Sequence, residues 1–583
     1  MDQTHLKGKD RPLEATIESL TERLEEAGFA VEEASRLNPV PNVHSVHIRA
    51  ADAPMLFTNG KGASPKAALA SGLGEFVERL ANNYFFADFY LGPDAAETEF
   101  VHYPHERWFP IPEDNSLPEG LLDETLLAIY DPDGELHAGN LVDTNSGAFS
   151  RGICALPYTR QRDGATRWFP VNLIGNLYVS NGMSAGNTPE EAQVQGLAEI
   201  LERAVKNRII AEGITPPRVP KAVLDRYPDI RAGIRSLEEA GFGVRVYDAS
   251  LGGRYPVMNV TLLNPADGSV FASFGAHPTF GIALERALTE LLQGRSLEQL
   301  DGFRPPTLDM AEVADPQNLE LHFIDSSGVV SWDFLGEAPD HPFSDWNLEA
   351  DNTAERDHLI GLLHEEGFEV FIADYTHLGA YACRILVPGL SEVYPVDELV
   401  VNNNNEGARL RPEILSLDQL DRARLDDLYE ALETGGHNDY QPVHELIGIV
   451  PEPGTLWAEL RVGELKARLA LALGRAEEAL GWVGWCLHTG ELPEERARLY
   501  SCVHARLEMA LADRAPENFD EALAQLHGTE TARLAAAMVE GREAFAGMLP
   551  APGSALDGLE RHRTLLRAYA RLHRVKESPA GIR

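Results

Sequence analysis

Two stretches of the sequence carry glutamate and arginine at the spacing of one helix face. The pattern Glu-x-x-Glu-Arg occupies residues 75–79 and returns, 124 positions later, at residues 199–203. At about 100° per residue the charged side chains of each copy share one face, and apolar residues fill the other. A third segment with an apolar face carries Arg286 and Glu290. Taken singly, each pattern is typical of a solvated helix with an internal ion pair.

Taken together, the three segments predict a shared site. If the helices converge, five carboxylates line one cleft: Glu75, Glu78, Glu199, Glu202 and Glu290. Like charges at short range are costly unless a cation neutralises them. Mg²⁺ does so through one or two carboxylates together with phosphate oxygens. Because Arg79, Arg203 and Arg286 could hold phosphate directly, the residues predict a metal-bridged ATP site.

The segments that position these residues repeat along the chain. Residues 24–31 recur as 237–244 and, more loosely, as 363–370, each with the end of a helix, a glycine suited to a left-handed cap and an apolar strand. A Gly-x-x-Pro helix start at 62–65 recurs at 275–278, and both recurrences share an offset of 213 residues. We expect a helix–strand–strand–strand–helix unit, present twice, as the frame of a large α+β domain.

Three details of this repeat are not explained by the sequence pattern alone. The third copy runs to about residue 399 without a Gly-x-x-Pro helix start, although one precedes the second Glu-x-x-Glu-Arg helix at 186–189. At the offset of 213, Glu290 aligns with Val77, so we expect the third helix to be rotated or shifted. Gly-Lys-Gly at 60–62 lacks the ending of a Walker A loop and is interpreted as part of a helix start.

The C-terminal part has a different character. After a run of asparagines at 402–405, helical spacing continues without evident strands, most clearly at 457–480 and 495–512. This pattern fits a degenerate tetratricopeptide-type array and a plain helical bundle equally well. The predicted organisation is a nucleotide-binding domain at 1–405, a linker and connecting helix at 406–440, and a helical interaction domain at 441–583.

Composition excludes several classes of protein. The 583 residues carry a net charge of -41, which disfavours a nucleic-acid-binding surface. The four cysteines lack the spacing of a metal site or a redox pair. No run of 18 apolar residues and no secretory signal occurs, so we expect a cytoplasmic protein with neither membrane nor nucleic acid as partner.

The three helical motifs resemble the signature of the YcaO family. The similarity extends to residues 38–42, 174–187, 274–278 and 322–327, and to the helical C-terminus, so it covers essentially the whole chain. It implies an ATP-binding fold peculiar to this family, with Mg²⁺ as cofactor, in a homodimer.

The resemblance also implies roles for individual residues. The magnesium ligands would be Glu75, Glu78, Glu199, Glu202 and Glu290. The phosphate contacts would be Lys9, Arg203 and Arg286. The nucleoside would be surrounded by Ser184, Asn187, Glu191 and Gln195. Thr16 stands where close relatives have serine and would keep a hydroxyl in the nucleotide site.

Members of the family use ATP to activate a backbone amide. Close relatives are regarded as accessory factors for β-methylthiolation of an aspartate in a small-subunit ribosomal protein by the radical enzyme RimO. By resemblance, RimO or that ribosomal protein is therefore the expected partner, and an ATP-utilising enzyme the expected activity. The alternative is a non-catalytic nucleotide-binding protein whose helical domain recruits a partner; turnover of ATP distinguishes the two.

Overall fold

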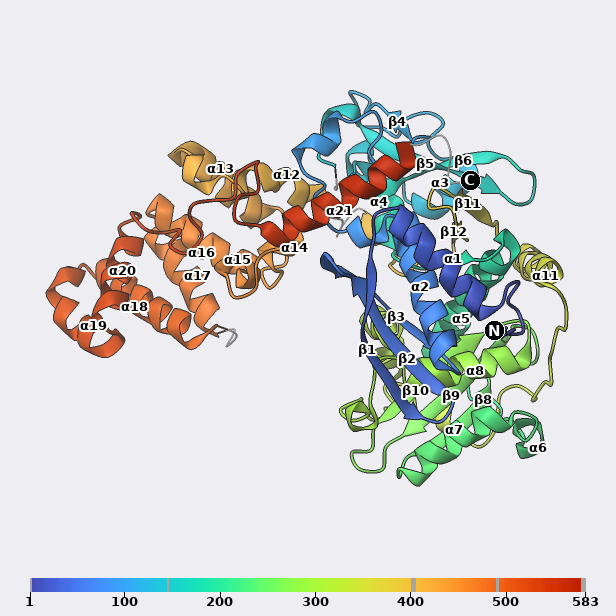
Figure 1. The fold of residues 1–583 in the computed structure, drawn as a ribbon. Helices are drawn as coiled ribbons and strands as arrows, with labels where there is room; N and C mark the ends of the chain where they lie inside the picture. The colour runs from blue at the N-terminus through green and yellow to red at the C-terminus, as the bar shows by residue number, and fades with distance from the viewer. Residues whose placement is uncertain (1–2, 144–145, 400–404, 489–491, 578–583) are drawn as a thin grey trace.

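The computed structural model describes residues 3–143, 146–399, 405–488 and 492–577. It consists of a body of helices and sheets from which an arm of helices projects (Figure 1). In the described residues, no helix combines the length and the apolar character that crossing a bilayer requires.

The first repeat unit is a three-stranded sheet between two helices. Helix α1 (Leu13–Glu26) leads into strands β1 (Val31–Val40), β2 (Val43–Ala50) and β3 (Ala53–Gly62), which pair antiparallel in that order, and α2 (Pro65–Ala81) follows. As expected, Ser64 caps α2 by accepting a hydrogen bond from the Ala67 amide at 3.2 Å, with Pro65 in the first turn.

The second unit repeats this arrangement. Helix α7 (Pro228–Glu239) precedes β8 (Gly243–Asp248), β9 (Val257–Leu263) and β10 (Val270–Ala276), again antiparallel in chain order, and α8 (Phe280–Leu291) closes the unit. The predicted duplication of helix–strand–strand–strand–helix is therefore present.

A third unit also exists, but it is assembled from two separate segments. Helix α11 (Asn352–Glu365) leads into β11 (Phe371–Tyr375) and β12 (Tyr381–Leu386). The next strand of that sheet is β7 (Met183–Gly186), which pairs antiparallel with β12 and leads into α5 (Pro189–Ala211). The third copy thus has its final helix after all. That helix comes earlier in the chain, and the whole second unit lies between its two halves.

The three final helices pack in a ring. Helix α2 packs on β7 of the third unit, α5 on β10 of the second, and α8 on β3 of the first. Each final helix therefore touches its own sheet and that of a neighbouring unit. This arrangement turns the charged faces of α2, α5 and α8 toward a common region between the units.

The sheet of the third unit extends into the upper part of the body. Strand β11 also pairs with β5 (Ile153–Arg160), which pairs in turn with β4 (Arg107–Phe109) and β6 (Thr166–Pro170). Shorter helices lie around this sheet, among them α3 (Glu124–Tyr130), α9 (Met310–Val313) and α10 (Pro316–Ile324).

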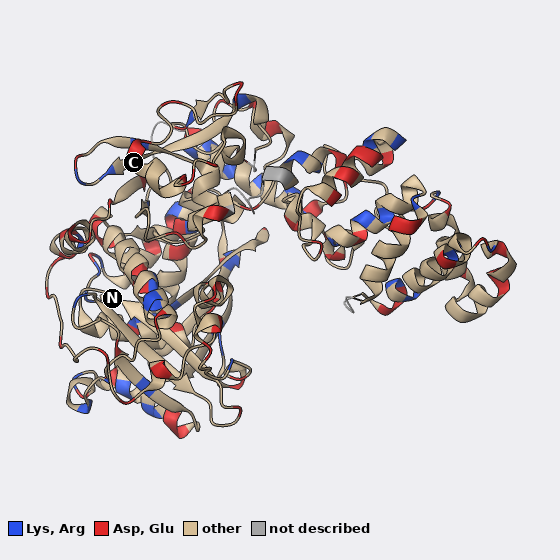
Figure 2. Cartoon of the chain, turned by 180° about the vertical axis from the view of Figure 1, so that it is seen from behind, with Lys and Arg blue, Asp and Glu red and all other residues tan. Residues whose placement is uncertain are grey.

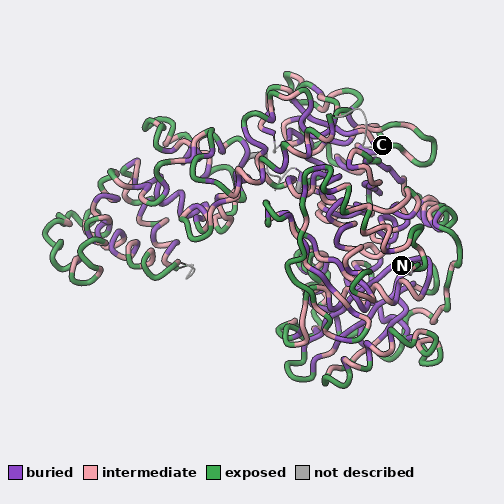
Figure 3. The backbone as a smooth tube through the Cα atoms, viewed as in Figure 1, coloured by how far each residue is buried: buried purple, intermediate pink, exposed green. Residues whose placement is uncertain are grey.

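The arm is built of antiparallel helices. The bounds are α12 (Asn405–Ile414), α13 (Arg422–Thr434), α14 (Val443–Leu446), α15 (Leu456–Glu459), α16 (Val462–Leu473), α17 (Ala476–His488), α18 (Glu494–Leu511), α19 (Asp520–His527) and α20 (Thr529–Val539). Gly474 ends α16 in the left-handed conformation, with φ of 70°, and permits the turn into α17. Buried residues follow the centre of the arm as well as the body (Figure 3).

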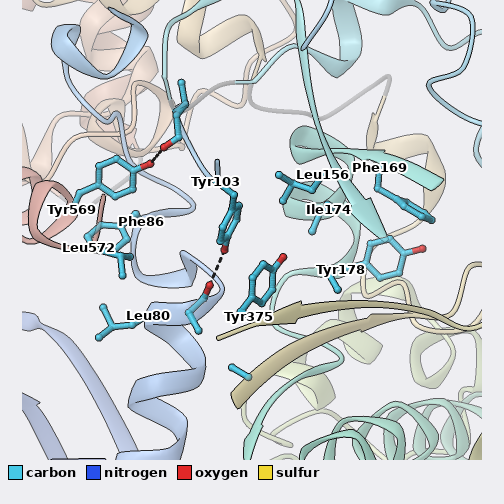
Figure 4. Close-up of a cluster of buried hydrophobic side chains, with 14 of the residues drawn as sticks. Leu80, Phe86, Tyr103, Leu156, Phe169, Ile174, Tyr178, Tyr375, Tyr569 and Leu572 are labelled. Atoms are coloured by element: carbon cyan, nitrogen blue, oxygen red, sulfur yellow. Dashed lines mark hydrogen bonds between the residues drawn. The ribbon is translucent and has the colours of Figure 1, made fainter. Parts of the chain in front are cut away.

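The last helix leaves the arm and returns to the body. Helix α21 (Glu560–Glu577) buries Tyr569 and Leu572 in the same apolar cluster as Leu80 and Phe86 of the first unit (Figure 4). The Tyr569 hydroxyl donates to the carbonyl oxygen of Val101. The core of the body therefore contains residues from both ends of the chain.

Candidate functional site

A packing contact fixes how the three units correspond. Gly60 in β3 lies against the backbone of α2, eight and twelve residues further on, and a methyl group there would overlap both positions. Gly275 in β10 lies against α8 at the same two spacings. In the third unit the equivalent residue is Ser184, whose hydroxyl donates to the Ala192 carbonyl oxygen at 2.6 Å, again eight residues further on.

This correspondence corrects the sequence alignment of the third motif. Gly60 and Gly275 are 215 residues apart, so the offset of 213, which the left-handed glycines Gly28 and Gly241 keep, is two residues too short at the last strand and final helix. Counted from the small residue of each unit, three glutamates occupy the same place, fifteen residues on (60 to 75, 184 to 199, 275 to 290): Glu75, Glu199 and Glu290. No rotation of the third helix is needed. The position of Glu78 and Glu202 is taken by Gln293 in that helix.

The carboxylates of the first two helices lie close enough to influence one another. Burial raises the pKa of Glu78 to about 8, against the opposing effect of the neighbouring Arg79 guanidinium. The negative charges of Glu199 on α5 and Glu75 on α2 raise this pKa further. The predicted convergence of the two faces is thus present in the structure.

Lys61 lies in the middle of this group, and sequence reasoning missed it. Its ammonium forms an ion pair with the Glu290 carboxylate of α8. Burial lowers the pKa of Lys61 to about 8, and the Arg286 guanidinium contributes to the decrease. Three carboxylates oppose that decrease: Glu202, Glu75 and Glu199. One lysine therefore has charges from all three helices around it.

Arginines and a backbone amide of the protein itself act as partners of the carboxylates in the cleft. Arg79 lies 3.3 Å from a Glu75 oxygen, and Arg203 lies 3.0 Å from a Glu199 oxygen. Glu202 accepts a hydrogen bond from the Ala276 amide at 3.0 Å. With these partners in place, no three Asp, Glu, His or Cys side chains of the described ranges are grouped closely enough to hold a metal ion.

The chemistry of the residues nevertheless suits a metal and a polyphosphate. Carboxylate oxygens are the hard ligands that Mg²⁺ prefers. Across the described residues, Nη1 of Arg203 and Nε of Arg286 are buried without a hydrogen-bond partner. A buried guanidinium N–H without an acceptor is costly, and a phosphate oxygen would satisfy it. The remainder of Arg203 is held by the Phe323 ring, 4.3 Å away, and Nη1 of Arg286 donates to Gln195 at 2.5 Å.

The N-terminal segment closes over the start of α5. Lys9 lies 3.3 Å from a carboxylate oxygen of Glu191, whose other oxygen accepts from the Asp10 amide at 2.9 Å. The Thr16 hydroxyl donates to Asn187 Oδ1 at 2.9 Å. Four of the residues predicted to bind the nucleotide therefore meet here, namely Lys9, Thr16, Asn187 and Glu191, whereas Gln195 contacts Arg286 on α8.

Helix α5 connects the two groups. From Pro189 to Arg203 its axis spans about 21 Å, at about 1.5 Å per residue, which is long enough to run beside a whole nucleotide. Ser184 differs from the other predicted residues. It is fully buried, and its hydroxyl is used in packing β7 against α5. Contact between Ser184 and a nucleoside stays a prediction, as do the individual ligand roles.

Comparisons with known proteins agree with this architecture. Residues 59–391 match the family model described as YcaO cyclodehydratase, ATP- and Mg²⁺-binding, and residues 407–578 match the YcaO cyclodehydratase C-terminal domain. The chain is 51% identical over 581 residues, 99% of each protein, to the ribosomal protein S12 methylthiotransferase accessory factor YcaO of Escherichia coli strain K12. The chain belongs to the YcaO family.

A second YcaO relative is an uncharacterised protein of Haemophilus influenzae, 50% identical over 582 residues and 99% of each chain. Of the solved structures, YcaO from Methanopyrus kandleri bound with AMPPCP and Mg²⁺ matches with 19% identity and a TM-score of 0.40, covering 67% of this chain and 95% of that one.

The comparisons confirm the family and the α+β fold with a helical C-terminal domain. They agree with the prediction of ATP and Mg²⁺ at the level of the family, whose description names both. The domain boundaries at 405 and 440 stay predictions.

Proposed function

We propose that this protein binds ATP with Mg²⁺ in the cleft between α2, α5 and α8, and that it acts as an accessory factor in RimO-dependent β-methylthiolation of an aspartate in a small-subunit ribosomal protein. One observation carries the nucleotide part: acidic faces from three units meet in a region that also holds Arg203 and Arg286 with unsatisfied N–H groups. The name of the Escherichia coli relative supports the accessory role.

In this proposal the residues have distinct tasks. The five glutamates, Glu75, Glu78, Glu199, Glu202 and Glu290, hold the metal. Arg203 and Arg286 bind phosphate oxygens, and Lys9 with the residues around Asn187 and Glu191 holds the remainder of the nucleotide. Bound Mg²⁺ supplies positive charge to the phosphate oxygens.

The same site suits activation of a backbone amide in a partner polypeptide. When a nucleophile adds to the amide carbonyl, the electrons of the C=O π bond move onto the oxygen. This oxygen would accept the γ-phosphoryl group of ATP with ADP as the leaving group, and the guanidinium groups of Arg203 and Arg286 would stabilise the negative charge during the transfer. The protein acts in the cytoplasm as a homodimer, and its tetratricopeptide-like arm recruits RimO or the ribosomal protein.

The first experiment is calorimetric binding of ATP with and without Mg²⁺. We expect Mg²⁺-dependent binding to the native protein and none to the Glu199→Ala, Glu290→Ala double variant. Binding that neither manipulation changes would exclude this cleft as the nucleotide site. The exposed pair Glu113→Ala, Glu119→Ala serves as a charge-matched control.

A second function remains open because the arm is large and has its own core. In this second function the nucleotide is a structural ligand that is not hydrolysed, and the protein only recruits a partner. ATP hydrolysis that stays at background with RimO and the ribosomal protein present would favour this function over an enzyme.

A further inference from the structure

A large cavity lies where the helical arm meets the body, away from the nucleotide cleft. Its volume is about 1080 Å³. The body contributes α10, the segment 389–396 and Asn207 of α5, and the arm contributes residues 435–446, which include α14. Figure 1 shows α14 at the junction of arm and body.

The lining of this cavity is mainly acidic. Three carboxylates line it, those of Glu320, Glu392 and Glu445; none of its described lining residues is Lys or Arg, and His437 is the titratable base among them. Within the described part of the chain, none of the three takes part in an ion pair. Glu320 and Glu392 accept hydrogen bonds only from neutral groups, among them the hydroxyls of Tyr394 at 2.7 Å and Tyr178 at 2.8 Å.

Several carboxylates elsewhere in the protein form ion pairs with arginines. In the nucleotide cleft, Glu75 and Glu199 each pair with an arginine on their own helix. In the arm, the buried Glu464 lies 3.2 Å from the Arg468 guanidinium. Both kinds of charge are spread over body and arm alike (Figure 2), so an acidic cavity whose described lining holds no Lys or Arg is a local feature. The missing cations can come from a ligand.

Two further groups indicate the kind of ligand. Oδ1 of Asn207 is buried at the cavity wall and, in the described residues, has no hydrogen-bond donor. A backbone N–H of a peptide would satisfy it. Tyr440 lines the cavity and is 53% exposed; its ring contacts Trp485, with centroids 5.1 Å apart, and its exposed part is available to a Lys or Arg side chain.

We propose that this cavity binds a Lys- or Arg-rich segment of a partner polypeptide. The inference rests on the proposed function, because it assigns the chemical class of the polypeptide that the protein serves. Asn207 lies one helical turn beyond Arg203 on α5, and α10, which packs on α5, forms another part of the wall. A segment held here is therefore anchored beside the helix that carries the phosphate-binding arginine.

The test uses the full-length protein and a fluorescein-labelled peptide of alternating Lys and Gly, with a Glu–Gly peptide for comparison. Fluorescence anisotropy should show binding of the Lys peptide only, weakened by salt. The Glu320→Gln, Glu392→Gln, Glu445→Gln variant should bind it about tenfold or more weakly. The matched control is Glu113→Gln, Glu119→Gln, Glu135→Gln, which removes the same charge from exposed positions elsewhere and should bind normally.

A second variant guards against misfolding of the first. Gln441→Lys adds a cation to the cavity wall and should weaken binding to a similar extent. Equal affinity of all variants, equal binding of both peptides, or displacement of the peptide by spermidine at equal charge would overturn the proposal; the last would indicate a small polyamine instead.

MgATP binding is measured on the same samples. If nucleotide binds and the peptide does not, this inference alone fails. If the peptide binds through the cavity but no nucleotide binds, the nucleotide site fails and the cavity stands.

Discussion

The ion pair between Lys61 and Glu290 joins the first repeat unit to the second. Lys61 lies near the end of β3, and Glu290 lies in the last turn of α8. Because Glu202, Glu75 and Glu199 also act on this lysine, its ammonium serves as the counter-charge of the carboxylate cluster when metal is absent.

We expect Lys61→Met to make the metal-free protein less stable and more responsive to magnesium. Removing the ammonium leaves the carboxylates uncompensated, at a cost of about 1–2 kcal/mol. The cost is this small because the Glu290 side chain is 39% exposed, so solvent screens its charge. Thermal denaturation in EDTA and in MgCl₂ measures both effects.

Lys66→Met is the control, because Lys66 pairs with Glu14 at 2.6 Å, and both side chains belong to a different group of charges. A magnesium-induced shift in Tm of the same size in Lys61→Met, Lys66→Met and the native protein would contradict the role given to Lys61.

Two glycines of the first unit should respond in opposite ways to alanine. A methyl group on Gly60 would overlap the backbone of α2, so Gly60→Ala should force α2 away from β3 and lower the free energy of unfolding by about 3 kcal/mol or more. Gly74 lies within α2, and no atom lies within 4 Å of the position that a Cβ would occupy there. Gly74→Ala should therefore stabilise the protein by about 0.5–1 kcal/mol. Denaturant unfolding of both variants checks the close contact; loss of stability in both, or in neither, would disprove it.

Arg203 should matter more for nucleotide binding than for folding. Nη1 of Arg203 has no acceptor in the described structure, and a hydrogen bond to a charged group contributes about 1.5–3 kcal/mol. Arg203→Met should therefore weaken MgATP binding by about tenfold to a hundredfold, as measured by calorimetry. Arg208→Met alters an exposed arginine of the same helix and should have no effect on affinity. Similar affinities of both variants would remove Arg203 from the site.

His562 should make stability depend on pH. Its ring lies buried between the arm and the body, accepting from the Val450 amide and donating to the Tyr90 carbonyl oxygen. Burial lowers its pKa from 6.5 to about 4. Between these values the unfolded chain binds more protons than the folded one, so the stabilisation present above pH 6.5 is lost as the pH falls toward 4.

Replacement of His562 by asparagine should remove about 2–3 kcal/mol of the stability difference between pH 6.5 and pH 4.5, given about 1.4 kcal/mol per pKa unit. Thermal denaturation across this range provides the comparison, with the exposed His358→Asn as control. If the stability of His562→Asn changes with pH in parallel with that of the native protein, the result would argue against a neutral buried ring.

Much of the fold and site could be predicted from local patterns. The caps at Ser64 and Thr188 and the spacing of the glutamates are properties of short segments, and a helix presents its faces in the same way wherever it packs. The pairing of β7 with β12 could not be predicted, because the two strands are nearly 200 residues apart and no local pattern marks them as neighbours.

The position of Lys61 in the cleft was not predicted, for a related reason. Its signal, a lysine between two glycines, was assigned to a helix start, whereas the structure places it in β3 with its side chain in the cleft. The offset of 213 holds for the left-handed glycines Gly28 and Gly241 but not for the final helices, because the packing of Gly60 and Gly275 against those helices requires 215. Small residues at close contacts were the better guide to equivalence.

The return of α21 to the body has a consequence for how the protein is made. Tyr569, whose ring lies 5.1 Å from that of Phe86, is synthesised 483 residues (569 − 86) after it. Because synthesis proceeds at roughly 5–20 residues per second, that apolar surface stays exposed for about half a minute or longer before α21 packs on it. A nascent chain that stops short of α21 keeps this surface exposed, where chaperones and proteases can recognise it, so the body is completed only after α21 has been made.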